Sequence, residues 1–307
     1  MLSKRLRADL ALLFCAIIWG ATFVALKDAL PDVSVFVYLA VRFGMAAAAM
    51  GILFFRSLRE VNRQTIWAGA QIGFFMFGGY AFQTAGLQFT TPSKAAFITG
   101  SSVIVVPILV AVFERRRPNA WIWAGALSAF LGLYLLTVPP EGLGGLNRGD
   151  PLVFGGAVMF ALHIIFIGRH VAKHAVGSLA FLQVATTALL SAMCIPILSA
   201  AGWESPRLVW TGTLIFAVLV TAFGSTVIGF SFQTWAQQYT PPAHTAIFIS
   251  LEPVFAVLTS WLLARERLTG RILLGGGLIL LGILIAELRG PTPTIPESPE
   301  PVVRSAE

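Results

Sequence analysis

The sequence predicts an all-α membrane protein in which ten transmembrane helices form two inverted five-helix repeats. Three observations predict this fold class: an excess of apolar residues, ten apolar runs long enough to cross a bilayer, and a pattern of polar residues that recurs in both halves. Of the 307 residues, 57% are hydrophobic and 11% are charged. Soluble domains average about 25% charged residues, so we expect this chain to use lipid as its main solvent.

The apolar runs follow one another along most of the chain, and a helix needs about 20 apolar residues to cross the hydrocarbon core. Their length, and the absence of strict alternation, favour helices over barrel strands. The run at 208–235 is long for one crossing, which a tilted helix would accommodate. The predicted spans are 9–26, 35–55, 66–87, 94–113, 121–138, 151–167, 179–199, 208–235, 243–263 and 272–288.

The longest connection lies midway and is predicted to link two repeats. Residues 139–150 carry two prolines and four glycines, which is typical of a loop. This divides the chain into a first repeat at 1–138, a linker at 139–150, a second repeat at 151–288 and a proline-rich, polar tail at 289–307 that we expect to be disordered.

Lys and Arg are more numerous in the loops on the side of the N-terminus. The positive-inside rule therefore predicts that both termini are cytoplasmic in the cell (inner) membrane. This bias comes from the first half, because the second half alone would favour the reverse orientation.

The repeat is clearest between the third and eighth spans. At an offset of 150, eight of the eighteen positions in 79–96 and 229–246 are identical, and these include Gln, Thr and Pro. Five spans separate the copies, and an odd number of crossings inverts one copy relative to the other. Inverted repeats recur in secondary transporters, whose substrate site lies near the midplane, although duplication without transport is the alternative. The identical residues are Gly79, Phe82, Gln83, Thr84, Gln88, Thr90, Pro92 and Ala96, matched by Gly229, Phe232, Gln233, Thr234, Gln238, Thr240, Pro242 and Ala246.

Short segments between residues 8 and 288 resemble a known family. They are AIIWGATF at 16–23, VRF at 41–43, KAAFITG at 94–100 with Pro107, LEPVF at 251–255 and ERL at 266–268. In order and spacing they resemble EamA-type transporters of the drug/metabolite transporter superfamily. The resemblance implies a ten-helix bundle around a central pocket, and export or exchange of amino acids, related metabolites or drug-like compounds. One departure is that the Leu-Glu-Pro signature has no equivalent in the first half, where Ser101 stands at the aligned position.

Two ionisable residues fall inside predicted spans, where a charge costs about 3 kcal/mol or more unless it is paired or hydrated. Arg42 could bind a substrate carboxylate or phosphate, or a gating partner, through its planar fork. Alternatively, it could form a fixed structural pair or snorkel outward. Glu252 precedes Pro253, which can interrupt a helix. It could couple transport to protons or belong to a gate, or it could be the partner of Arg42 or the cap of a kinked segment.

Five further residues are candidates for the substrate-binding or gating site. Gln83 and Gln233 are related by the repeat and would present the same polar group from both halves, although hydrogen bonding between helices is the alternative. His163 and Gln183 lie in otherwise apolar spans, and Trp19 is far from the interfaces where tryptophan usually lies. For these three, packing is the alternative role. Lys94, by contrast, is expected to snorkel from a span end to the interface.

The sequence contains no HExxH, GxSxG or Walker A motif, so we expect no enzyme activity, no cofactor and no metal site. The expected partners are a small-molecule substrate and the lipid bilayer, with protons as a candidate coupling ion and no nucleic acid. Stretches of small residues leave a homodimer open. A membrane-embedded enzyme acting on lipid and a non-transporting membrane scaffold are the alternative functions.

Overall fold

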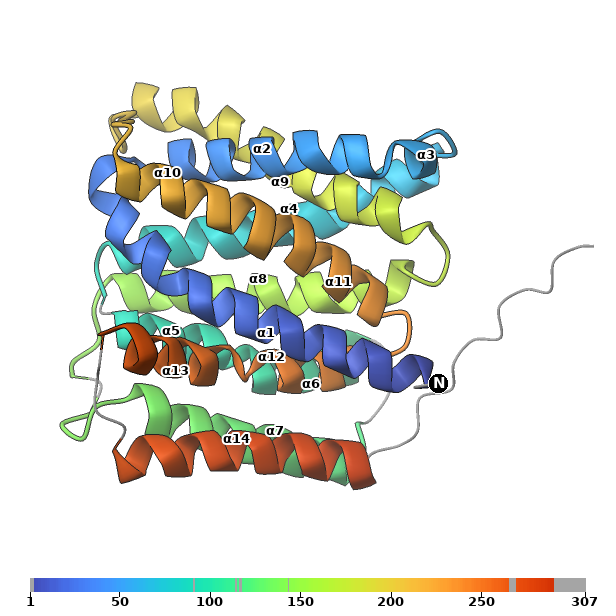
Figure 1. The fold of residues 1–307 in the computed structure, drawn as a ribbon, viewed down its shortest axis with the longest axis vertical. Coiled ribbons are helices and arrows are strands. Elements are labelled where there is room, and N and C mark those ends of the chain that lie inside the picture. The colour runs from blue at the N-terminus through green and yellow to red at the C-terminus, as the bar shows by residue number, and fades with distance from the viewer. Residues whose placement is uncertain are drawn as a thin grey trace, which may run out of the picture.

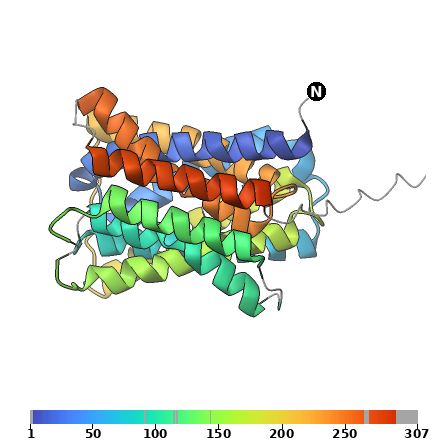
Figure 2. The same cartoon turned by 90° about the horizontal axis from the view of Figure 1, so that it is seen from below.

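The computed structural model describes residues 3–90, 92–113, 115, 118–142, 144–264 and 269–289, and they are almost entirely helical. The helices lie side by side, and the chain turns back at the two ends of the bundle (Figures 1 and 2). One end, the termini face, holds the start of the first helix and the end of the last. The other, the linker face, holds the loop between the two halves. The predicted fold class, an all-α membrane protein, is confirmed.

Each half contains one long series of helices. The first half has α1 (Lys4–Ala29), a 3-10 turn η1 (Leu30–Asp32), α2 (Val35–Leu53), α3 (Phe55–Leu58), α4 (Arg63–Leu87), α5 (Pro92–Gly100), α6 (Ser102–Phe113) and α7 (Ala120–Thr137). The second half has α8 (Gly149–His170), α9 (Val176–Ala200), α10 (Gly212–Leu219), the π-helix η2 (Val220–Ile228), α11 (Gly229–Ala236), α12 (Pro242–Ile249), α13 (Glu252–Ala264) and α14 (Gly270–Arg289).

Within the described residues, eight helical segments are long and apolar enough to cross a membrane. Helices α1 and α4, of 26 and 25 residues, lie alongside them in the same bundle (Figure 1). A count of ten crossings stays a prediction. The predicted linker end moves slightly, because the Asn147 side chain accepts hydrogen bonds from the backbone N–H groups of Gly149 and Asp150 and so starts α8 at Gly149. The predicted disordered tail was 289–307: Arg289 is instead the last residue of α14, and 290–307 lie outside the described residues, as do 266–268 of the resemblance.

The fourth and ninth spans are each interrupted at mid-depth. Helix α5 ends at Gly100 before α6 begins, and α12 ends at Ile249 before α13 begins at Glu252. The Ser101 and Ser250 hydroxyls each donate to a carbonyl three residues earlier, both at 2.6 Å. Such bonds compete with the helical ladder. The segment at 94–113 is long and apolar enough to be a span, as predicted, but the sequence indicated a helix break only at Pro253 and not at Ser101.

The fifth spans of the two halves, α7 and α14, run antiparallel. A Cβ atom on Gly125 would lie 2.6 Å from the Gly282 carbonyl oxygen, and one on Gly132 would lie 2.4 Å from that of Gly275. A higher residue number on α7 thus meets a lower one on α14. Each of these helices is the fifth span of its half, so the two halves have opposite orientations along the axis of the bundle. The most extensive helix contacts, such as α4 with α8 and α2 with α9, likewise join the two halves.

The close contact between α7 and α14 predicts a stability effect. Gly275→Ala would place a Cβ atom 2.7 Å from the Gly132 oxygen and 2.9 Å from the Leu136 nitrogen, and such overpacking costs about 1–3 kcal/mol. We expect a lower thermal midpoint for the detergent-solubilised protein. Gly277→Ala on the same helix is the control, because its Cβ atom would meet nothing within 4 Å. An equal loss in both variants would contradict this account of the contact.

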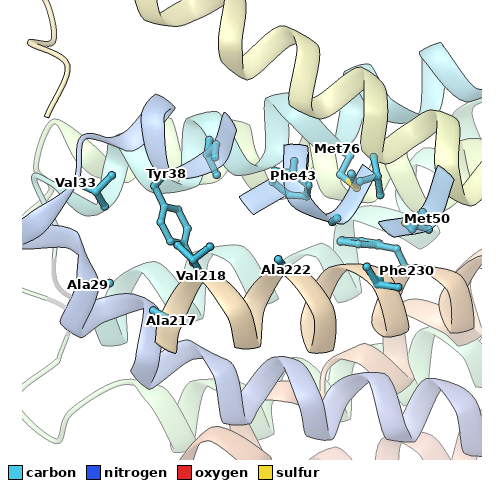
Figure 3. Packing of buried hydrophobic residues seen from close by; sticks show 14 of the residues in the cluster. Ala29, Val33, Tyr38, Phe43, Met50, Met76, Ala217, Val218, Ala222 and Phe230 are labelled. Carbon is cyan, nitrogen blue, oxygen red and sulfur yellow. The ribbon is translucent and has the colours of Figure 1, made fainter. Parts of the chain in front are cut away.

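The largest buried cluster lies between α2 and α10–α11. Figure 3 shows Tyr38, Phe43 and Met50 of α2 facing Val218 and Phe230 of the eighth span. Phe43 and Tyr38 are almost fully buried. This packing fixes α2 against the π-helix η2, and that contact positions the cation of the site described next.

Candidate substrate site

A central cavity of about 290 Å³ lies among helices from both halves. Six of the seven residues predicted from sequence line it: Trp19, Arg42, Gln83, His163, Gln233 and Glu252. The seventh, Gln183, is not part of the lining, although it contacts a residue that is. The structure therefore brings together side chains from α1, α2, α4, α8, α11 and α13 that are far apart in the sequence.

Arg42 is 3% exposed and is held by neutral groups. Its Nε donates to Thr226 Oγ1 at 3.0 Å, and its Nη2 donates to Ser225 Oγ at 3.0 Å and to the Tyr80 hydroxyl at 3.4 Å. The guanidinium carbon also lies 4.9 Å from the centre of the Tyr80 ring, within cation–π range. Among the described residues, no carboxylate forms an ion pair with it. Its positive charge is oriented but not neutralised by contact.

The π-helix η2 accounts for the position of these partners. Ser225 and Thr226 both lie in this wider helix, and the Thr226 hydroxyl donates back to the Thr221 carbonyl, five residues earlier, at 2.8 Å. Short π-helical segments in α-helices occur frequently at functional sites. Here the segment brings two hydroxyl groups to one guanidinium.

Glu252 is the first residue of α13, directly after the break in the ninth span. The positive end of a helix dipole favours a carboxylate there. Glu252 is partly exposed to the cavity, and no described residue donates a hydrogen bond to its side chain. The alternative reading of a fixed pair between Arg42 and Glu252 is not what the structure shows, because no ion pair joins them. The cavity is thus lined by one basic and one acidic side chain that form no ion pair with each other.

The two repeat-related glutamines both line the cavity but differ in their bonding. Gln83 Nε2 donates to Thr99 Oγ1 at 3.0 Å. Gln233 is 1% exposed, and its Oε1 accepts no hydrogen bond from the described residues. Buried polar atoms are nearly always paired. An acceptor oxygen is therefore available at the cavity wall.

His163 and Gln183 form one chain of hydrogen bonds. His163 Nε2 lies 2.8 Å from Gln183 Oε1, and Gln183 Nε2 donates to Thr234 Oγ1 at 2.9 Å. The amide oxygen can only accept, so His163 donates through Nε2. This chain joins α8, α9 and α11, and Gln183 fixes the imidazole ring from behind the cavity wall.

Aromatic side chains form much of the remaining wall. Trp19 donates its indole N–H to the Ser225 carbonyl at 2.8 Å, and its ring centre lies 5.3 Å from that of Phe230. Tyr80, Phe160 and Phe230 also line the cavity, and none of the three was predicted from the sequence. A signal for Phe160 exists: alignment of Arg-x-Asp at 7–9 with Arg-x-Asp at 148–150 places it opposite Trp19.

Lys94 does not snorkel to the interface, so that expectation is wrong. It is 5% exposed, and its Nζ lies 2.6 Å from Asp150 Oδ2 and donates to the Gly145 carbonyl at 2.8 Å. The position of Asp150, at the start of α8 and opposite the start of the fourth span, was not predicted from the sequence. This ion pair lies at the linker face and does not line the cavity.

Comparisons with known proteins agree with this architecture. The EamA-like transporter family matches residues 6–138 and again residues 147–288. An uncharacterized transporter of Archaeoglobus fulgidus is 37% identical over 291 residues, which cover 93% of this chain and 87% of the relative. The threonine/homoserine exporter RhtA of Escherichia coli K12 is 28% identical over 191 residues, or 62% of this chain and 60% of RhtA.

A solved crystal structure with 20% sequence identity has the same fold, with a TM-score of 0.77 over 92% of this chain and 97% of that chain. Both relatives named above carry the name of a transporter or exporter. The chain belongs to the EamA-like transporter family of the drug/metabolite transporter superfamily, and it is a multi-pass membrane protein that transports a small molecule.

Proposed function

We propose that the protein is a secondary transporter that exports or exchanges amino acids or closely related metabolites through the central cavity. The observation that carries this proposal is that Arg42 and Glu252 line one small cavity without touching each other. A free amino acid carries a carboxylate and an ammonium group on one carbon. The Arg42 fork suits the carboxylate, while Glu252 and the unpartnered Gln233 oxygen would accept hydrogen bonds from the ammonium group.

The rest of the cavity suits the remainder of such a molecule. Ligand sites are mainly apolar with a few placed polar groups, and Trp19, Tyr80, Phe160 and Phe230 supply the apolar walls. Among the relatives, RhtA is named as an exporter of threonine and homoserine. That name supports an amino acid as substrate of this chain as well.

Transport would proceed by alternating access. The cavity lies nearer the linker face than the termini face. Its lining includes Thr137, the last residue of α7, which lies near the linker face. On α1 the first lining residue is Trp19, which is more than halfway along the helix from the termini face. This conformation would therefore admit solute from the linker face. In the second conformation, the two inverted repeats would each adopt the arrangement that the other has here, so that the cavity opens to the termini face. With cytoplasmic termini in the cell (inner) membrane, the linker face is the outer one.

Substitution of Glu252 tests whether protons are the coupling ion. In proteoliposomes loaded with candidate amino acids, we expect saturable counterflow, and faster transport when a pH gradient is imposed. Glu252→Gln keeps an acceptor oxygen but removes the charge, so we expect a KM raised by about tenfold, since 1.4 kcal/mol is one decade, and no response to the gradient.

The matched control is Glu204→Gln. Glu204 accepts from the Val35 backbone N–H at 2.7 Å and does not line the cavity, so this variant should transport as the unaltered protein does. If no amino acid shows counterflow with folded protein, the proposed substrate class is wrong. If Glu252→Gln still responds to the gradient, proton coupling through Glu252 is wrong.

A further inference from the structure

Two polar clusters lie at opposite faces of the bundle and are related by the repeat. At the linker face, Thr90 Oγ1 donates to Asp150 Oδ1 at 2.8 Å. At the termini face, Thr240 Oγ1 donates to Asp9 Oδ1 at 3.1 Å. The threonines match at the offset of 150, and the aspartates match when the two Arg-x-Asp segments are aligned. Each cluster joins the first helix of one half to the third and fourth spans of the other.

The two clusters differ at one matched position. The linker-face cluster has Lys94, whose ammonium group contacts Asp150 at 2.6 Å. The residue 150 positions later is His244, with 3% exposure. Its Nε2 lies 3.2 Å from the Ala286 carbonyl oxygen and 3.8 Å from Glu287 Oε1. A permanent cation in one half is thus replaced in the other by a side chain that changes charge near neutral pH.

The termini-face cluster also holds one more carboxylate. Arg5 Nη2 lies 2.6 Å from Glu287 Oε2, and Arg5 Nε lies 4.0 Å from Asp9 Oδ2. Two carboxylates therefore share one permanent cation beside the His244 imidazole, and the buried Glu287 Oε1 accepts no hydrogen bond from the described residues. The linker-face pair of Lys94 and Asp150 is balanced. One added proton would balance the termini-face cluster in the same way.

The other elements packed against α12 bring no further charge to the cluster among the described residues. Helices α6 and α7 contain no charged residue. On α8, Arg169 lies over the Phe113 and Phe166 rings, and His170 bonds Gln71. On α14, Arg289 lies over the Trp121 ring. The groups that face His244 are Arg5 and Asp9 from α1 and Glu287 from α14.

We propose that Asp9, His244 and Glu287 together form a binding site for one proton, and that this proton holds α1, α12 and α14 together at the termini face. Closely spaced groups of this kind titrate as a unit. Without the proton, the excess negative charge favours separation of α1 from α14 and α12. The termini face therefore opens more readily as pH rises. This site is distinct from Glu252, and it does not depend on which solute the cavity binds.

Cys15 provides a natural probe of this opening. It is fully buried six residues beyond Asp9 on α1, and its Sγ lies 3.3 Å from the Gly229 carbonyl oxygen of α11. The experiment measures alkylation of Cys15 by N-ethylmaleimide in the full-length Cys194→Ser protein between about pH 5.5 and 8. Each rate is divided by that of the denatured protein at the same pH, which removes the intrinsic reactivity of the thiol. We expect the corrected rate to rise about fivefold or more, the lower end of typical coupling between sites.

Two substitutions replace the effect of the proton by different means. His244→Lys supplies the permanent cation found in the linker-face cluster, and Glu287→Gln removes the extra carboxylate. Both should keep the corrected rate low at every pH. His170→Gln, a histidine change at the same face away from the carboxylates, should keep the full pH response.

A corrected rate that does not change with pH in the unaltered protein would overturn the proposal. The same is true if His244→Lys and Glu287→Gln both retain the pH response. Thermal midpoints provide a second measurement: the midpoint of the unaltered protein should fall relative to that of His244→Lys as pH rises, and a constant difference would count against the site. Neither measurement involves transport, so failure of the amino-acid proposal would leave the result interpretable.

Discussion

Arg42→Ala is expected to reduce counterflow of substrate by about 30-fold or more when initial rates are compared at low substrate concentration. Truncating one member of a buried, hydrogen-bonded charge pair costs about 2–5 kcal/mol, and each 1.4 kcal/mol is a factor of ten. Once a substrate is bound, Arg42 and the substrate carboxylate would form such a buried charge pair. Its side chain is already oriented by Thr226, Ser225 and Tyr80, so little reorganisation would be needed on binding.

Two variants separate substrate binding from general damage. Arg42→Lys keeps the charge but loses the planar fork, so we expect intermediate transport with a raised KM. Arg271→Ala removes a partly buried arginine whose Nε donates to the Leu135 carbonyl at 3.1 Å and which does not line the cavity. That variant should transport normally. If Arg42→Ala transports as well as Arg271→Ala, Arg42 does not bind the substrate.

Asp150→Ala is expected to produce the largest loss of stability. The Lys94 and Asp150 side chains are 6% and 5% exposed and lie 2.6 Å apart. Removing one partner of a buried ion pair costs about 3–5 kcal/mol, because the other charge stays buried. The thermal midpoint of the detergent-solubilised protein should therefore fall sharply, and less protein should be recovered from membranes.

The matched control is Asp32→Ala at the same face. The Asp32 side chain accepts a single hydrogen bond, from Thr211 at 2.6 Å, at the end of the 3-10 turn η1, and a typical hydrogen bond contributes about 1 kcal/mol. Replacing the pair with apolar residues, as Lys94→Met with Asp150→Leu, should recover much of the lost stability. Equal losses for Asp150→Ala and Asp32→Ala would show that the pair is not an important stabilising contact.

Depth in the membrane could be predicted from the sequence, because hydropathy and run length limit where each helix crosses. Arg42, Glu252 and His163 were identified in this way, since a polar group in an apolar run needs a partner or water. The rotation of each helix about its axis could not be predicted. For that reason Gln183 was placed among the lining residues although it lies behind His163, and Tyr80 and Phe230 were not identified as lining residues.

The correspondence between the first and sixth spans was also missed. The offset of 150 aligns the third and fourth spans with the eighth and ninth, but the first and sixth spans follow a different offset and share few identities. Asp150 was therefore not seen as the counterpart of Asp9, and Lys94 was assigned to the interface. The break at Ser101 depends on a hydroxyl group bonding a local carbonyl, and many serines in helices do not do this.

The extensive contacts between the two halves bear on how the protein is made. The partners of α1, α2, α4 and α7 belong mainly to residues 149–289, so the helices synthesised first must reside in the bilayer without their final neighbours until the later ones are inserted. Their exposed small residues and buried polar groups then face lipid or membrane chaperones during biosynthesis. Folding of this single chain is in effect the assembly of two separately inserted pieces, and two polypeptides divided within 139–148 should associate into the same bundle.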